Sequence, residues 1–153
     1  MKSNILILGP KCSGKTTFIY TLLNIKKKPT ITIGADMFCY KYSNNNIIYF
    51  WDIGNGLHYT EIIYSLLSKV NTIIIIENNN TIDFISQTIS FINNYNIKNL
   101  IIIFNMNENS NKFNKKQIES LNSNITFNIF YINCNNFNEV TNISKFIEKN
   151  IIL

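Results

Sequence analysis

Apolar residues follow two different spacings along the chain, and the two spacings alternate. Short uninterrupted apolar runs are typical of strands that are buried on both faces of a parallel sheet. Segments with apolar residues every three or four positions are typical of helices that cover such a sheet. The runs predict strands at residues 4–8, 72–76, 100–104 and 125–132. The helical spacing predicts helices at residues 17–23, 60–69, 81–95, 113–121 and 139–149.

A hairpin interrupts this alternation in the first third of the chain. Two segments with strand character, Met37–Tyr42 and Ile47–Trp51, are separated by Asn44–Asn46, and asparagine tolerates the positive φ of a tight turn. With the hairpin included, the pattern predicts an α/β fold, a three-layer sandwich around a six-stranded, mostly parallel sheet with one antiparallel edge strand. A length of 153 residues, without internal repeats or a linker, predicts a single domain over residues 1–153.

A glycine-bounded loop joins the first predicted strand to the first predicted helix. Residues 9–16 have the spacing G-x-x-x-x-G-K-[ST], and their place between a strand and a helix is that of a phosphate-binding P-loop. In such a loop the backbone N–H groups point at a phosphate, and the helix adds the positive end of its dipole. The context disfavours the alternative, a lysine-bearing turn between core elements. The predicted phosphate-binding residues of the loop are Lys11, Cys12, Ser13, Gly14, Lys15, Thr16 and Thr17.

Three side chains have specific predicted roles around the phosphates. Lys15 would reach the β- and γ-phosphates, and the Thr16 hydroxyl would ligate Mg²⁺. Asp52 ends the second strand of the hairpin, which is where a carboxylate is needed beside the magnesium ion of a P-loop site.

Charge and composition narrow the class of partners and the compartment. The net charge is +5, but the lysines are scattered and cluster only at residues 26–28, so we expect no nucleic-acid partner. Three cysteines without metal-ligand spacing predict free thiols in a reducing compartment; for Cys12 a small tolerated residue is favoured over redox control. The chain shows no transmembrane run, signal peptide or lipidation motif, so we expect a cytoplasmic protein that reaches membranes, if at all, through a protein partner.

Three features together resemble the Ras-superfamily small GTP-binding proteins. They are the P-loop, Thr32-Ile33-Gly34 sixteen residues further on, and Trp51-Asp52-Ile53-Gly54 after the hairpin. The resemblance covers essentially the whole chain. The Trp-Asp-x-Gly segment and the short hairpin resemble the Arf-like branch, whereas Tyr59 and residues 77–84 resemble Rab-like proteins, and the choice between the two stays open.

The resemblance implies that the chain binds GTP or GDP together with Mg²⁺. It places the Thr32 hydroxyl on the metal and the Thr32 N–H on the γ-phosphate; Thr30 is a weaker candidate, and an ordinary strand-edge threonine is the structural alternative. Asp52 would hold a water molecule on the magnesium ion. Asn55 would present a backbone N–H to the γ-phosphate, or Gly56 would do so after a shift of one residue.

Two parts of the hydrolytic machinery of that family are missing here. The glutamine that orients the attacking water is replaced by Gly56, and His58 is the nearest polar side chain, for which exposure to solvent is the favoured interpretation. All 14 basic residues are lysine, so no arginine of this chain can stabilise the transferring phosphate. We therefore expect GTP hydrolysis to be slow at best.

Base recognition is also altered relative to the family. The Asn-Lys-x-Asp motif becomes Asn105-Met106-Asn107-Glu108, in which Glu108 keeps a carboxylate for the guanine N1–H and N2–H, and Met106 covers the base with a thioether chain. The later Ser-Ala motif becomes Cys134-Asn135, where the Asn135 N–H would meet guanine O6. The structural alternative is that both segments are strand-end loops. Guanine preference is therefore expected in a weakened form.

These residues favour a nucleotide-dependent switch that acts through effector or regulator proteins. Residues 29–36 and 53–60 would be ordered by GTP and Mg²⁺ and read by those partners, and the resemblance implies vesicle or intracellular transport as the setting. The alternative is a structural or scaffolding subunit of the same fold without a hydrolysis cycle. A small-molecule kinase is disfavoured, because such an enzyme needs lid arginines that the chain lacks.

Overall fold

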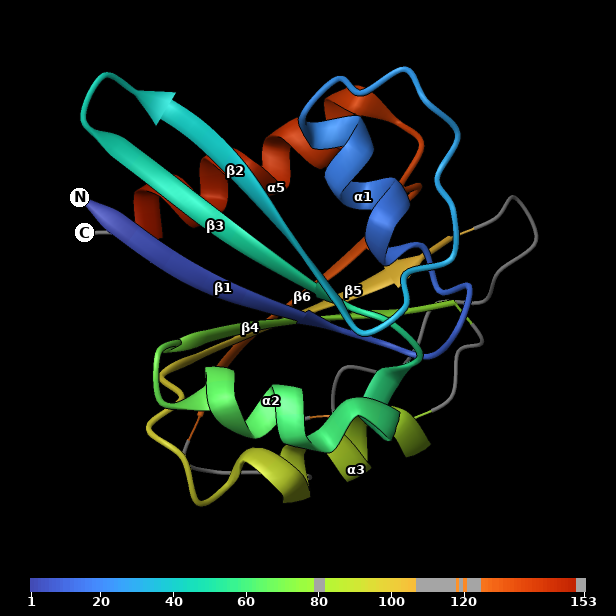
Figure 1. Cartoon of the computed structure of the whole chain (residues 1–153), viewed down its shortest axis with the longest axis vertical. Helices are drawn as coiled ribbons and strands as arrows, with labels where there is room; N and C mark the ends of the chain where they lie inside the picture. The colour runs from blue at the N-terminus through green and yellow to red at the C-terminus, as the bar shows by residue number, and fades with distance from the viewer. Residues whose placement is uncertain (79–81, 107–117, 119, 121–124, 151–153) are drawn as a thin grey trace.

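The computed structural model of the chain describes residues 1–78, 82–106, 118, 120 and 125–150. Its elements alternate as the apolar pattern predicts (Figure 1). The strands are β1 Lys2–Leu8, β2 Ala35–Ser43, β3 Asn46–Ile53, β4 Thr72–Glu77, β5 Asn99–Asn105 and β6 Thr126–Ile132. The helices are α1 Lys15–Leu22, α2 Thr60–Leu67, α3 Asp83–Ile92 and α5 Phe137–Asn150, with a 3₁₀ turn at Gly56–Tyr59.

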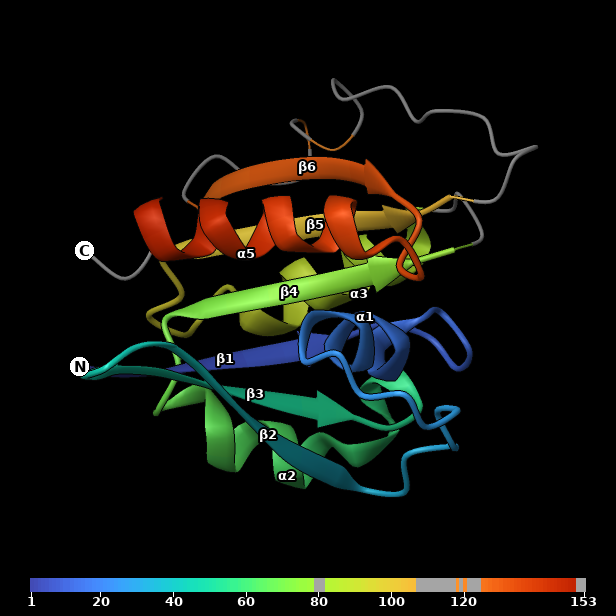
Figure 2. The same ribbon diagram turned by 90° about the horizontal axis from the view of Figure 1, so that it is seen from above.

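The strands form one six-stranded sheet in the order β2-β3-β1-β4-β5-β6. Every neighbouring pair is parallel except β2 and β3, which form the antiparallel hairpin at one edge. Figure 2 shows α1 and α5 on one face of this sheet and α2 and α3 on the other. The predicted α/β three-layer sandwich with one antiparallel edge strand is therefore confirmed.

The core lies on both sides of the central strands. All six residues of β4 are buried, as expected for a parallel strand that is covered on both faces. On one face Ile74 and Ile76 pack in a cluster with Phe18 of α1 and Ile143 of α5. On the other face the alternate residues of β4 pack in a second cluster with α2 and α3. Successive side chains along each strand thus contribute alternately to two separate apolar layers.

The predicted elements differ from the observed ones mainly at their ends. The first helix begins two residues earlier than predicted, at Lys15, because the P-loop runs directly into it. The hairpin strands are longer than predicted, since pairing extends from Ala35 with Ile53 to Ser43 with Asn46. The predicted helix at 113–121 falls almost wholly outside the described residues. Within the described part of the chain, no helix is long and apolar enough to span a membrane.

The apolar layer beneath α1 gives a direct test of the fold. Phe18 is fully buried against the sheet, whereas Phe137 at the start of α5 is 53% exposed. Phe18→Ala should lower the free energy of unfolding by about 3–5 kcal/mol, because it leaves a cavity in a packed layer. The matched Phe137→Ala change should lower it by about 0.5 kcal/mol or less. Urea unfolding of both variants measures the difference, and equal losses would contradict this packing.

Candidate nucleotide-binding site

The loop between β1 and α1 forms the floor of a cavity of about 270 Å³ at the carboxyl end of the sheet. The segments before β2 and after β3 close its sides. All nine residues that the sequence predicts to bind phosphate line this cavity. The lining also includes Thr30, the weaker alternative to Thr32, together with Pro29, Ile31 and Gly54, which have no predicted phosphate role.

Two glycines of the loop are required by close approaches of other groups. A Cβ atom on Gly9 would lie 2.1 Å from the Ile76 carbonyl oxygen, at the end of β4. A Cβ atom on Gly14 would lie 2.4 Å from Asn105 Nδ2, and Gly14 also has a φ of 106°, a value that disfavours any side chain. The glycines therefore let the loop lie against the ends of the neighbouring strands, rather than only allowing it to turn.

Lys15 is held inside the loop by two backbone carbonyls. Its Nζ donates to Gly9 O at 2.9 Å and to Pro10 O at 2.8 Å, and the residue is 5% exposed. Burial lowers the pKa of Lys15 below the usual lysine value, while the charge of Asp52 acts in the opposite direction. The ammonium is thus positioned at the cavity floor, with carbonyl contacts that a phosphate can replace.

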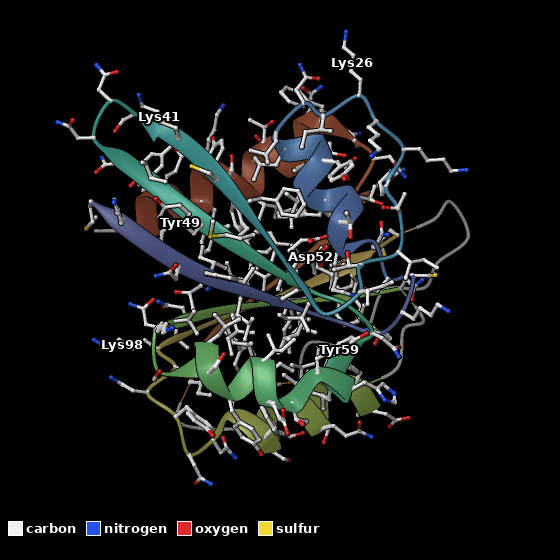
Figure 3. All side chains as sticks on the ribbon, in the orientation of Figure 1. Lys26, Lys41, Tyr49, Asp52, Tyr59 and Lys98 are labelled. Atoms are coloured by element: carbon white, nitrogen blue, oxygen red, sulfur yellow. The ribbon has the colours of Figure 1, made fainter. Side chains whose placement is uncertain are left out.

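The three predicted magnesium-site residues, Thr16, Thr32 and Asp52, converge from three separate elements. Asp52 Oδ2 accepts hydrogen bonds from Thr16 Oγ1 at 2.6 Å and from Thr32 Oγ1 at 2.9 Å. The two hydroxyl oxygens lie 3.1 Å apart. Burial raises the pKa of Asp52 above the usual aspartate value. The two hydroxyl hydrogen bonds and the Lys15 charge offset part of this shift. Figure 3 shows Asp52 in the interior, whereas Lys26, Lys41 and Lys98 lie at the periphery.

The chemistry of this cluster fits Mg²⁺. Two hydroxyls and a carboxylate supply only oxygen atoms, which are the ligands that this ion prefers. Asp52 Oδ1 is buried without a hydrogen-bond partner, so one carboxylate oxygen remains able to accept from a metal-bound water. The Ser13 hydroxyl is likewise buried and unpaired within the loop, and a buried unpaired donor of this kind is suited to a phosphate oxygen.

The segments before β2 and after β3 are in direct contact beside the cavity. Gly54 N donates to Gly34 O at 2.9 Å, and a Cβ atom on Gly54 would lie 2.1 Å from Thr32 O. The absence of a side chain at Gly54 is therefore what lets Thr32 reach Asp52. The next residue, Asn55, is exposed with a φ of 47°, a backbone conformation in which asparagine is enriched.

Among the described residues that line the cavity there is no glutamine or histidine. Gly56 begins the 3₁₀ turn that leads into α2. His58 is exposed and lines a neighbouring hollow with Lys11, Asn55 and Gln87, rather than the phosphate cavity itself. This exposure of His58 agrees with the interpretation that the sequence favours.

Two of the predicted base-binding residues, Asn105 and Cys134, lie beside the phosphate loop and are joined to it by hydrogen bonds. Asn105 Nδ2 donates to Ser13 O at 3.0 Å, and Asn105 Oδ1 accepts from Cys134 N at 3.0 Å. Thr21 Oγ1 of α1 donates to Cys134 O at 2.7 Å. Cys134 is fully buried, and burial raises the pKa of its thiol to about 12, so the thiol is neutral at physiological pH. One amide thus connects the P-loop to the loop after β6.

Met106 and Asn135, two further predicted base-binding residues, lie in different surroundings. Met106 is half-buried against the α2–α3 side of the core. The Asn135 N–H, predicted to face guanine O6, donates to Asn133 Oδ1 at 2.9 Å and would have to exchange that partner. Glu108 lies outside the described residues. Their roles in base binding stay predictions.

One hydrogen bond to the P-loop could not be predicted from the sequence. Asn78 follows β4, and its Nδ2 donates to Cys12 O at 3.0 Å, which ties the exposed tip of the P-loop to the sheet. Asn78 begins a run of three asparagines that composition alone assigns to a surface loop.

A family model matches more than half of the sequence. Residues 4–110 match the family model described as Roc, "Ras of Complex, Roc, domain of DAPkinase". No curated protein shows significant similarity to the sequence. The matched residues include the P-loop, both segments that flank the cavity and Asn105.

Solved structures share the fold at low sequence identity. The Arl6 (BBS3) small GTPase of Trypanosoma brucei, solved with the nucleotide analogue GppNp, superposes with a TM-score of 0.79 at 13% identity, covering 97% of this chain and 96% of that one. The Roco2 RocCORdC structure of Methanosarcina barkeri, bound to GDP, gives a TM-score of 0.69 at 19% identity. It covers 97% of this chain, which spans 48% of that one.

The family match extends over more than half of the chain, and it agrees with the sheet order and with the cavity at the P-loop. The chain therefore belongs to the Roc family and is a divergent member of the Ras superfamily of GTP-binding proteins.

Proposed function

We propose that the chain is a switch protein that binds GTP or GDP with Mg²⁺ and acts through protein partners. The observation that carries this proposal is the convergence of Thr16, Thr32 and Asp52 at the cavity that holds Lys15. These residues come from α1, from the segment before β2 and from β3, and their meeting point has the chemistry of a magnesium and polyphosphate site. The guanine nucleotides in the two similar structures support the choice of base.

Each residue of the cavity has a defined task in this proposal. The Lys15 ammonium, now bonded to the Gly9 and Pro10 carbonyls, would bind phosphate oxygens. The Thr16 and Thr32 hydroxyls and the Asp52 carboxylate are the groups that would hold the magnesium ion, directly or through water. Magnesium would supply charge neutralisation at the phosphates. Thr32 belongs to the segment that precedes β2, and in this proposal it contacts the metal and the γ-phosphate. The position of that segment would therefore depend on the bound nucleotide, and this dependence is the basis of switching.

The partner surface in this proposal is formed by residues 29–36 and 53–60. Within it, Ile31 is 69% exposed and Ile33 is 83% exposed. Apolar side chains this open, next to residues that contact the nucleotide, are suited to bind an effector or regulator. We propose a cytoplasmic setting in vesicle or intracellular transport, with membranes reached through such a partner.

A second candidate function is a scaffolding subunit that binds nucleotide without a hydrolysis cycle. It is favoured by one observation: Gly56 cannot orient a water, and His58 is directed to a different hollow. The two functions share the nucleotide site and differ in turnover.

The phosphate cradle is tested by removing the ammonium. Lys15→Ala should weaken GDP and GTP binding by roughly a hundredfold or more, because charge-assisted contacts to the phosphates are lost. Lys69→Ala is the matched control, since Lys69 is exposed and lies outside the cavity. Calorimetric titration in the presence of Mg²⁺ measures both variants. Unchanged affinity in a folded Lys15→Ala protein would rule out the site.

Base selection is tested by competition among four nucleotides. We expect GDP and GTP to bind more tightly than ADP and ATP, by a smaller margin than a full Asn-Lys-x-Asp motif gives, because Met106 replaces the lysine. Displacement of a fluorescent guanine nucleotide measures the four affinities side by side. Equal affinity for adenine nucleotides would end the guanine assignment while leaving the phosphate site intact.

Hydrolysis is tested by restoring the missing side chain. The wild-type protein should hydrolyse GTP more slowly than typical small GTPases in single-turnover assays, because no glutamine or arginine contributes. Gly56→Gln should raise the rate by about tenfold or more if orientation of the water is limiting. Ser90→Gln, on the exposed side of α3, is the control. A wild-type rate at the usual intrinsic level would contradict slow turnover.

A further inference from the structure

Two asparagine side chains hold successive carbonyl groups of the P-loop. Asn78, directly after β4, donates from Nδ2 to Cys12 O at 3.0 Å, and Asn105, at the end of β5, donates from Nδ2 to Ser13 O at 3.0 Å. The two donors come from neighbouring strands of the sheet. Asn105 belongs to the predicted base-binding motif, whereas the sequence predicts no role in the site for Asn78.

The Asn78 bond fixes the direction of one peptide group. In a trans peptide the C=O and the N–H point in opposite directions. Because Cys12 O is held by the Asn78 amide, the N–H of the next residue, Ser13, points away from that amide. It donates to Pro10 O at 3.3 Å, the same oxygen that accepts from Lys15 Nζ at 2.8 Å. The Ser13 N–H is therefore directed to the inside of the loop, where inward N–H groups form an anion-binding hollow.

The backbone of Cys12 also needs support from its surroundings. Cys12 has a φ of 61°, in the left-handed region that a residue with a Cβ atom adopts rarely. Such a conformation persists where surrounding contacts hold it. The Asn78 bond is made to the carbonyl of this same residue and is therefore a contact of that kind.

Asn78 is itself oriented by the residue before it. Glu77, the last residue of β4, is 1% exposed, and its Oε1 accepts from Asn78 N at 2.9 Å. Asn78 Oδ1 is buried without a hydrogen-bond partner. A buried unpaired oxygen costs stability, and the Nδ2 bond to the loop is what an amide provides here and an apolar side chain would not.

We infer that Asn78 is a positioning residue of the proposed nucleotide site. Through its bond to Cys12 O it keeps the tip of the P-loop in the conformation that turns the Ser13 N–H toward the phosphates. Both partners of this bond are protein atoms, so it can form before the nucleotide binds and raises the fraction of protein that is ready for the ligand. The inference rests on the proposed function and adds to it a residue that does not line the cavity.

Asn78→Leu tests this role, because it removes the donor and nearly keeps the shape of the side chain. In stopped-flow mixing with a fluorescent GDP analogue and Mg²⁺, the variant should bind about three- to tenfold more slowly, the factor expected for one lost hydrogen bond. Its dissociation rate should stay within about twofold of the wild-type rate, since the loss acts on the competent fraction. Asn94→Leu is the matched control, exposed and outside the cavity, and should leave both rates unchanged.

The cysteines separate positioning of the loop from general stability. Cys12 and Cys39 are exposed, and Cys134 is buried. In protein without added nucleotide, Asn78→Leu should raise the rate of maleimide labelling at Cys12 by about threefold or more, because the tip of the loop is released. Labelling at Cys39 and Cys134, assigned by peptide mapping, should not change. A general loss of stability would instead expose Cys134.

The outcomes bear on different statements. An unchanged association rate, or an unchanged labelling rate at Cys12, would overturn the inference while leaving the nucleotide site intact. Labelling of Cys134 that rises together with that of Cys12 would also overturn it, since the role of Asn78 would then be structural. A wild-type protein that binds no guanine nucleotide would overturn the proposed function itself, and this inference with it.

Discussion

The Asp52 carboxylate is the contact on which the site depends. It is fully buried, and an ionised carboxylate inside a protein is costly unless it is compensated. Here the compensation comes from two hydroxyls on different elements and from the Lys15 charge. The carboxylate thereby holds α1, β3 and the segment before β2 together at one point, and its two hydroxyl partners, Thr16 and Thr32, line the cavity.

Close backbone approach makes this arrangement possible. The P-loop lies against the ends of β4 and β5 because Gly9 and Gly14 have no side chain, and the Thr32 segment lies against β3 because Gly54 has none. Each of these approaches leaves no room for a Cβ. The polar cluster is therefore supported by three glycines, of which Gly9 and Gly54 lie against backbone carbonyls and Gly14 lies against the Asn105 amide.

The fold was predictable because its signals are local. Buried runs such as that of β4 and the Asn turn of the hairpin specify elements by themselves, and alternation of strands and helices restricts their arrangement. The convergence of Thr16, Thr32 and Asp52 was also predictable, because the P-loop motif places Thr16 and the resemblance to the Ras superfamily implies the positions of Thr32 and Asp52. The Asn78 contact to the P-loop and the exchange needed at Asn135 were not, because an asparagine in an Asn-rich chain carries no information about its partner. Helix ends differed where capping and loop geometry, rather than apolar spacing, decide the boundary.

The amide of Asn105 has a thermodynamic consequence for the ligand as a whole. It accepts from the loop after β6 and donates to the P-loop, so the ordering of one loop is coupled to the ordering of the other. The entropy lost on ordering them is a single cost rather than two. Under the proposed function, a free nucleoside or a free pyrophosphate would meet that whole cost with half of the contacts, whereas the intact nucleotide would meet it once with all of them. Such a pocket would favour the complete molecule over its fragments by more than the sum of the separate contacts.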